Sequence, residues 1–265
     1  MLSLLLAGAG VAAFVYGALL AALYLLQERV IFLPEPLPAQ HRFDFGADVH
    51  ERWIEVPGGR LNALHLKLPS ARGIVFYLHG NAGNLQTWFG DAAFYREQGF
   101  DLFMLDYRGY GKSSGRIRSE AELHADVRAA WDAVAAPYAG RLRVVAGRSL
   151  GSAPAARLAA AVQPDLTLLV SPYRSLVALA GEHYPWAPTR LLRYPMRTDA
   201  ALAGVRGAVL IVHGARDEVI AASHGRALQA LVPKARLVLV PGAGHGDVQD
   251  FPQFHEAVAA ALRAL

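Results

Sequence analysis

Apolar residues fall into two patterns along this chain: one continuous block at the start, then a series of short, separated runs. The block extends from Leu2 to Leu26 without a charged residue. A helix over these residues, at ~1.5 Å per residue, would be ~37 Å long and exceed the ~30 Å hydrocarbon layer of a bilayer. We therefore predict an N-terminal transmembrane anchor over residues 1–28, which makes the chain a single-pass membrane protein.

Two other interpretations of the block are weaker. A cleaved signal peptide would have a basic region before a shorter apolar stretch, and no basic side chain precedes this one. The run from Gly8 to Ala13 imitates a dinucleotide-binding fingerprint, but Val11 to Leu26 is apolar around the whole helix, whereas a Rossmann helix has a polar side. The side of the membrane stays open, because Arg29 is offset by Glu28.

The chain after the anchor begins with a linker and a hairpin. Residues 29–42 include three alternating prolines, Pro34, Pro36 and Pro38, and predict an extended leash that carries the next domain away from the bilayer. A domain is expected from 43 to 265. Residues 52–56 and 61–66 alternate apolar and polar positions around a Pro-Gly-Gly turn, which predicts an antiparallel hairpin.

The pattern then changes to solid apolar runs, as in buried parallel strands. These runs cover 74–78, 102–105, 142–146, 166–170, 208–212 and 237–240, and helix-length segments lie at 85–98, 120–136, 150–162, 223–231 and 252–265. Alternating strands and helices predict the α/β class, with a mostly parallel, doubly wound sheet led by the hairpin. Residues 172–207 are too long for one crossover helix and predict a small lid above the sheet.

Composition narrows the classes of function. The chain has 26 Lys and Arg against 22 Asp and Glu, a net charge of +4, and the basic residues are dispersed, so we expect no nucleic-acid partner. Cysteine is absent, which excludes disulfides and thiol catalysis. Neither composition nor pattern indicates an oligomeric state.

The run from Leu142 to Ala153 carries the chemical signal. A predicted strand leads into Gly147-Arg148-Ser149-Leu150-Gly151 and then into a helix of small residues, which is the pattern of a nucleophile elbow. Such a turn lifts the serine Oγ above the sheet and faces the next N–H toward the same space. We predict Ser149 as the nucleophile. A second G-x-S-x-G at 111–115 begins five residues after its strand ends and precedes no helix, so it cannot form an elbow.

Active sites of such sheets form at the carboxyl ends of the strands, so the other strand exits supply the partners. The glycine-rich exit 79–84 offers backbone N–H groups, and we predict an oxyanion hole from the N–H groups of Asn81 and Leu150, with Ala82 as the alternative to Asn81. A plain helix-capping role for this loop is the competing interpretation.

Two further exits offer a carboxylate and an imidazole. Asp217 follows the strand at 208–212, and His245 follows the strand at 237–240. We predict His245 as the general base and Asp217 as the residue that orients it. The rival carboxylates are Glu218, Asp106 and Asp247, and we expect Asp106 to organise its loop.

Metal and nucleotide sites are not indicated. The histidines lack H-E-x-x-H or similar spacing, and His79 and His213, which open glycine turns, are expected to brace loops. Gly111-Lys112-Ser113 ends like a phosphate-binding loop, but Asp106 stands where the first glycine would be. We expect no metal and no cofactor.

Ser149, Asp217 and His245 occur in the order Ser, Asp, His, each directly after a predicted strand. This arrangement, with the stretches 79–84, 106–111, 147–152 and 244–245, resembles the α/β-hydrolase superfamily. It looks most like the membrane-anchored serine hydrolases that include monoacylglycerol lipases and protein-depalmitoylating thioesterases. The likeness covers roughly residues 43–265, and the lid has no motif that matches.

The resemblance implies hydrolysis of carboxylic esters or thioesters through an acyl-enzyme. Leu176, Tyr184 and Trp186 in the lid, together with the anchor, favour an acyl chain on a lipid or an acylated substrate. Two alternatives stay open: a hydrolase of soluble small esters or peptides, and a membrane-tethered binding protein of the same fold without turnover.

Overall fold

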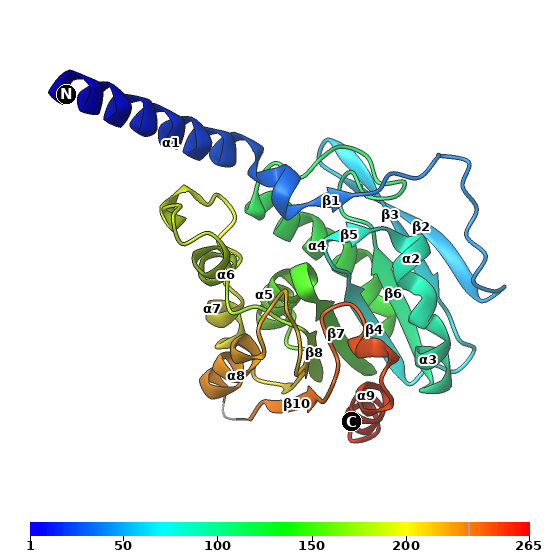
Figure 1. The fold of residues 1–265 in the computed structure, drawn as a ribbon. Coiled ribbons are helices and arrows are strands. Elements are labelled where there is room, and N and C mark those ends of the chain that lie inside the picture. Colours follow the sequence, from blue (N-terminus) through cyan, green and yellow to red (C-terminus); the bar gives the residue numbers. More distant parts are fainter. Residues whose placement is uncertain (233) are drawn as a thin grey trace.

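The computed structural model describes residues 1–232 and 234–265 (Figure 1). Its centre is an eight-stranded sheet in the order β10-β9-β8-β7-β4-β6-β3-β2, in which β2 and β3 form an antiparallel hairpin, β3 runs antiparallel to β6, and all other neighbours are parallel. The strands of this sheet are β2 Val49–Val56, β3 Gly59–Leu66, β4 Gly73–Leu78, β6 Phe100–Leu105, β7 Leu142–Arg148, β8 Leu166–Val170, β9 Ala208–Gly214 and β10 Arg236–Val240. The predicted hairpin and six parallel runs are confirmed.

Helices cover both faces of the sheet and divide the core into two apolar clusters. One face carries α4, α5, α7 and α8, whose apolar positions pack with those of β4 and β7; the other carries α2, α3 and α9. The helices of the domain are α2 Leu85–Trp88, α3 Ala92–Glu97, α4 Glu120–Ala135, α5 Ser152–Val162, α6 Leu176–His183, α7 Thr198–Leu202, α8 Ala222–Leu231 and α9 Pro252–Arg263. Because both faces are covered, the middle strands contain few polar residues.

Two elements differ from expectation. The segment 85–98 is not one helix, because the 3-10 turn Phe89–Asp91, with Gly90 at its centre, separates α2 from α3. Strand β3 alternates in sequence as a half-exposed strand would, but both of its faces are buried. Two of its polar side chains make internal contacts: Asn62 donates to Glu51 Oε1 at 2.6 Å, and His65 Nε2 lies 3.0 Å from Tyr138 Oη.

The lid sequence divides into two parts. Helix α6 and the 3-10 turn Thr189–Leu191 stand above the strand exits, whereas Tyr194, Met196 and Leu202 are fully buried in the main core. The covering part is therefore shorter than the predicted 172–207. Because apolar side chains after residue 193 are buried in the core, the rest of the segment 172–207 packs into the domain.

Helix α1 (Leu2–Ile31) projects from the domain as a single long helix (Figure 1). It is the one helix of the described residues that is long and apolar enough to cross a membrane, by length and composition. The extended chain after it is not a free leash. Strand β1 (Leu33–Pro34) pairs in parallel with β5 (Ala82–Gly83), and Gly111 N–H donates to Glu35 O at 3.1 Å.

Buried His65 makes stability depend on pH. Burial, aided by the charges of Lys67 and Arg52, lowers the pKa of His65 to about 4. Since the unfolded chain takes up this proton near pH 6.5 and the folded chain does not, acid favours unfolding between pH 6.5 and 4. At pH 4 we expect a loss of about 3 kcal/mol relative to pH 7 through this group alone. Denaturant unfolding of wild type and His65→Gln across this pH range would measure it.

The control for this series is His50→Gln, because exposed His50 pairs with His65 across β2 and β3. His65→Gln should flatten the pH dependence, and His50→Gln should change it far less, because the charge of His50 is the smallest of the contributions that lower the pKa of His65. Equal slopes in all three proteins would show that His65 is not the group responsible.

Candidate active site

The turn after β7 brings Ser149 to the carboxyl edge of the sheet in a strained conformation. Ser149 has φ +50°, in the left-handed region that costs a non-glycine residue energy, and opens the 3-10 turn Ser149–Gly151 before α5. Glycine is required at 147 and at 151, because neither position has room for a Cβ atom. A Cβ on Gly147 would lie 2.3 Å from Gly151 O, and one on Gly151 would lie 2.1 Å from Leu78 O. The turn is thus pressed against the end of β4.

Three of the predicted site residues are joined by hydrogen bonds. Ser149 Oγ lies 3.0 Å from His245 Nε2, and His245 Nδ1 lies 2.8 Å from Asp217 Oδ2. Because a carboxylate can only accept, Nδ1 carries the proton and Nε2 is the acceptor for the serine hydroxyl. Ser149, His245 and Asp217 follow strands β7, β10 and β9, respectively. In sequence, Ser149 is 96 residues from His245, and Asp217 is 28 residues from it.

Asp217 is fixed by its own loop. Its Oδ1 accepts the N–H groups of Val219 at 3.0 Å and Ile220 at 2.7 Å, and His213 Nε2 lies 3.4 Å from Oδ2. Burial alone would raise the pKa of Asp217, but the contacts with His213 and His245 and the backbone N–H of Ile220 outweigh it and hold the pKa below its usual range. The carboxylate is therefore ionised at neutral pH.

The rival carboxylates lie elsewhere. Glu218 is exposed, and Asp247 accepts Gly244 N–H at 2.7 Å within the turn that carries His245. Asp106 is buried, accepts Leu85 N–H at 3.0 Å and faces His79 Nε2 at 3.4 Å, so it organises a loop, as expected. In the second G-x-S-x-G, Ser113 Oγ donates to Asp106 O at 2.7 Å and is buried in structural contacts.

The loop after β4 carries Asn81 beside Ser149. Its carbonyl groups are held from behind: Gly80 O accepts the His79 ring at 2.7 Å, and Asn81 O accepts Leu33 N–H at 2.9 Å and Tyr110 Oη–H at 2.7 Å. An N–H points away from the carbonyl of its own peptide. Anchored carbonyls therefore fix the direction of the N–H groups of Asn81 and Ala82.

Arg148 was not anticipated as part of the site. Its Nη2 donates to the carbonyls of His245 and Gly246, both at 2.9 Å, and its guanidinium lies 5.1 Å above the Trp88 ring. The side chain therefore ties the His245 loop to the residue next to Ser149. The only sequence signal was its place inside the elbow motif, which says nothing about a partner almost 100 residues away.

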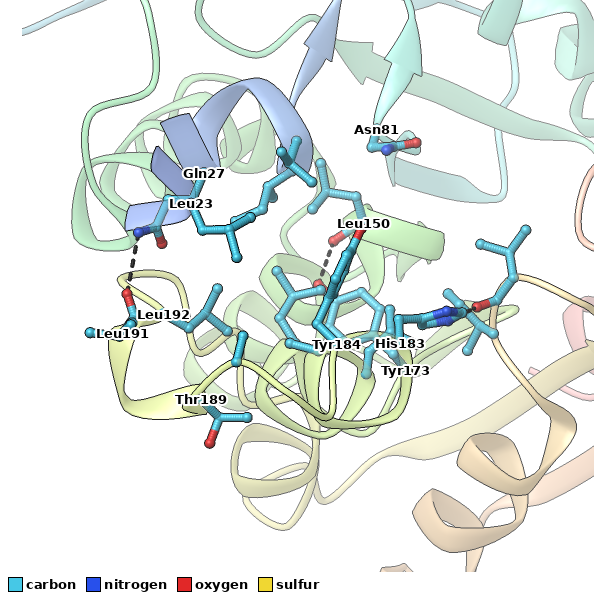
Figure 2. A pocket seen from close by; sticks show the side chains of 18 of the residues that line it. Leu23, Gln27, Asn81, Leu150, Tyr173, His183, Tyr184, Thr189, Leu191 and Leu192 are labelled. Carbon is cyan, nitrogen blue, oxygen red and sulfur yellow. Dashed lines mark hydrogen bonds between the residues drawn. The ribbon is translucent and has the colours of Figure 1, made fainter. Parts of the chain in front are cut away.

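Two cavities meet at Ser149. An apolar cavity of about 510 Å³ extends from Ser149, Leu150 and His245 between α1 and the lid; Figure 2 shows Leu23 and Gln27 on one side of it and Leu191 and Leu192 on the other. A second, more polar cavity of about 480 Å³ also opens at Ser149. Its lining includes Glu35, Thr87, Asp91, Arg148 and Gln249. Asn81, Ser149 and His245 line both.

Within the described residues, no group of three or more His, Cys, Asp and Glu side chains is arranged to hold a metal ion. The two other histidines at strand exits contact backbone carbonyls. His79 contacts Gly80 O, and His213 Nε2 lies 2.8 Å from Ile220 O.

A parallel sheet with a strained serine turn at a central strand exit defines a hydrolase of the α/β type. A family model described as "Serine aminopeptidase, S33" matches residues 69–180. The chain is 33% identical to the α/β hydrolase domain-containing proteins 17C of Xenopus tropicalis, over 213 residues, and 17B of Xenopus laevis, over 207 residues. These alignments cover 77% and 75% of this chain and 66% and 69% of the relatives.

Two further likenesses agree. An uncharacterized protein of Mycobacterium tuberculosis is 34% identical over 233 residues, which are 83% of this chain and 81% of that protein. The structure of an esterase from Pyrococcus furiosus has the same fold, with a TM-score of 0.71 and 17% identity over 88% of this chain and 98% of the esterase. The chain belongs to the α/β-hydrolase family and is of the serine-hydrolase type.

The strain at Ser149 predicts an unusual order of stabilities. Ser149→Ala keeps the Cβ that disfavours φ +50°, whereas Ser149→Gly removes it, so the glycine variant should be the more stable of the two by about 1 kcal/mol. Thermal unfolding should show this as a midpoint ~2–4 °C higher. Ala160→Gly, in ordinary helix of α5, is the control and should lower the midpoint instead. A less stable Ser149→Gly would mean that the turn is not strained.

Proposed function

We propose that this protein hydrolyses carboxylic esters or thioesters of long acyl chains, with Ser149 as nucleophile, His245 as general base and Asp217 as its orienting carboxylate. The observation that carries the proposal is the 3.0 Å contact between Ser149 Oγ and His245 Nε2, two residues that line the apolar cavity. A serine hydroxyl is a weak nucleophile until a base takes its proton, and this contact supplies the base.

The reaction follows from these positions. His245 Nε2 takes the Ser149 proton as Oγ attacks the acyl carbon, and the ionised Asp217 stabilises the imidazolium. Negative charge on the former carbonyl oxygen is received by the N–H groups of Asn81 and Leu150, each worth about 3–4 kcal/mol of transition-state stabilisation. Collapse releases an alcohol or thiol that takes the proton from His245. Water, deprotonated by His245, then attacks the acyl carbon of the acyl-enzyme. As the bond to Ser149 Oγ breaks, His245 returns this proton to Oγ and the acid is released.

The cavities support an assignment of the two halves of the substrate. The apolar cavity suits the acyl chain, and its volume lies within the ~300–1,000 Å³ of small-molecule sites. The polar cavity, with Arg148, Asp91 and Gln249, suits a hydrophilic alcohol or thiol. An aminopeptidase would instead need an anion for the substrate ammonium on the acyl side, and among the described residues lining the apolar cavity none is Asp or Glu.

We further propose that α1 is a retained membrane anchor. Its apolar length supports this, and its last turn is built into the domain: Gln27 is 6% exposed, and Arg193 N–H donates to Gln27 Oε1 at 2.7 Å. A cleaved leader would leave these groups without their partners.

Loss of the nucleophile and loss of the orienting carboxylate should have different costs. Ser149→Ala should abolish turnover of p-nitrophenyl acyl esters and labelling by a fluorophosphonate probe. Asp217→Asn should keep the fold but lower kcat about 10³–10⁴-fold, because the amide stabilises the wrong imidazole tautomer. Steady-state kinetics on detergent-solubilised protein measure both, with Glu218→Gln as the matched control on the same loop. An unlabelled, inactive wild type would favour a binding protein of this fold.

Acyl-chain preference tests the assigned cavity. Across p-nitrophenyl esters from acetate to palmitate we expect kcat/KM, corrected for substrate aggregation, to rise with chain length, because each buried CH₂ contributes ~0.8 kcal/mol at most. L-amino acid p-nitroanilides should not be hydrolysed. A sharp preference for acetate would instead indicate a hydrolase of small soluble esters.

A further inference from the structure

The anchor helix contributes directly to the cavity that holds Ser149. Leu23, Tyr24, Gln27, Val30 and Ile31 of α1 line it, on the side opposite the lid. These residues recur at helical spacing, so one face of the last turns of α1 is turned toward the domain. Without them the apolar cavity would lack a wall.

This part of α1 is packed in place rather than hinged. Gln27 Nε2 donates to Leu191 O at 3.3 Å, Glu28 pairs with the Arg193 guanidinium, and Tyr194 Oη–H donates to Glu28 Oε1 at 3.0 Å. The ring of Phe32 meets Tyr194 edge to face at 5.1 Å. The end of the helix, the lid and the core therefore form one packed unit.

Helix α1 is long enough both to span a bilayer and to line the cavity. The helix has 30 residues, and the nine from Leu23 to Ile31 flank the cavity, which leaves Leu2–Ala22. Those 21 residues would measure ~31 Å, close to the ~30 Å hydrocarbon thickness. The cavity therefore begins where the bilayer ends.

The lid reaches alongside the spanning part. Tyr16 Oη–H donates to Trp186 O at 2.8 Å, and the side chains of Tyr184 and Trp186 are 41% and 47% exposed at this tip. Tyr16 lies about 10 Å along the helix from Leu23. The tip of the lid therefore extends past the level of Ala22 toward the bilayer, and its exposed Tyr and Trp are the amphipathic residue types enriched near membrane–water boundaries.

We propose that an acyl chain passes from the bilayer directly into the cavity between α1 and the lid, so that the anchor helix is part of the substrate site. The inference rests on the proposed function and adds a source and a route to it: the substrate is a membrane-resident acyl ester or thioester whose chain enters laterally. The reacting carbonyl would stop at Ser149, near the interface, and the hydrophilic leaving group would stay in the polar cavity.

The test adds a larger side chain to the face of α1 that lines the cavity and, as a control, to another face. Leu23→Trp narrows the cavity, because Leu23 is part of its wall. Leu25→Trp adds the same ring outside the cavity, on a face of α1 where Leu25 is 70% exposed. In the full chain reconstituted in phosphatidylcholine vesicles, the ratio of kcat/KM for p-nitrophenyl palmitate to that for the acetate should fall at least tenfold in Leu23→Trp. It should change less than twofold in Leu25→Trp. Val30→Trp serves as a second cavity variant, and fluorophosphonate labelling counts the folded sites in each protein.

A second arm tests the route. Wild-type turnover of p-nitrophenyl palmitate should be at least tenfold faster when ester and enzyme share vesicles than when the ester is supplied in separate vesicles. Equal rates in the two arrangements, or an unchanged palmitate-to-acetate ratio in both cavity variants, would overturn lateral entry. Failure of the proposed function would look different, because wild type would then hydrolyse neither ester and would resist the probe.

Discussion

The contact between the Ser149 turn and the end of strand β4 is the constraint on which the site depends. Gly151 passes so close to Leu78 O that any side chain would collide with it, and Gly147 meets the carbonyl of Gly151 in the same way. This closeness keeps the Ser149 turn against the end of β4, where the loop that carries Asn81 begins. A looser turn would relieve the left-handed Ser149 backbone and would also separate the groups that the proposed reaction needs together.

Sequence reasoning predicted this edge well because buried strands leave a direct signal. Solid apolar runs mark β4, β7, β9 and β10, and polar residues that follow such runs must lie at one edge of a parallel sheet. The sequence pattern could not indicate which contacts hold the residues at this edge in position. The clasp of Arg148 on the carbonyls of His245 and Gly246, and the Tyr110 hydroxyl on Asn81 O, join side chains to distant backbone, which no local pattern encodes.

The N-terminal segment illustrates the same limit differently. Hydropathy predicts a spanning length, but an all-apolar helix does not reveal which of its faces meets protein. The informative exception was Gln27, a polar residue at the end of the block that turns out to be buried against the lid. The prolines that predicted a leash do extend the chain, yet Leu33 pairs with the loop that carries Asn81. A single stretch of chain thus connects α1 to the site.

The two cavities give the proposed reaction a direction. If α1 spans the membrane as proposed, an acid with a long chain, once freed from Ser149, would leave through the apolar cavity toward the bilayer, where the transfer of its chain out of water is favourable. A hydrophilic alcohol or thiol would leave through the polar cavity into solvent. Because the two products separate into different phases, they would seldom meet again at Ser149, so resynthesis of the ester would be suppressed by the position of the site at the membrane surface.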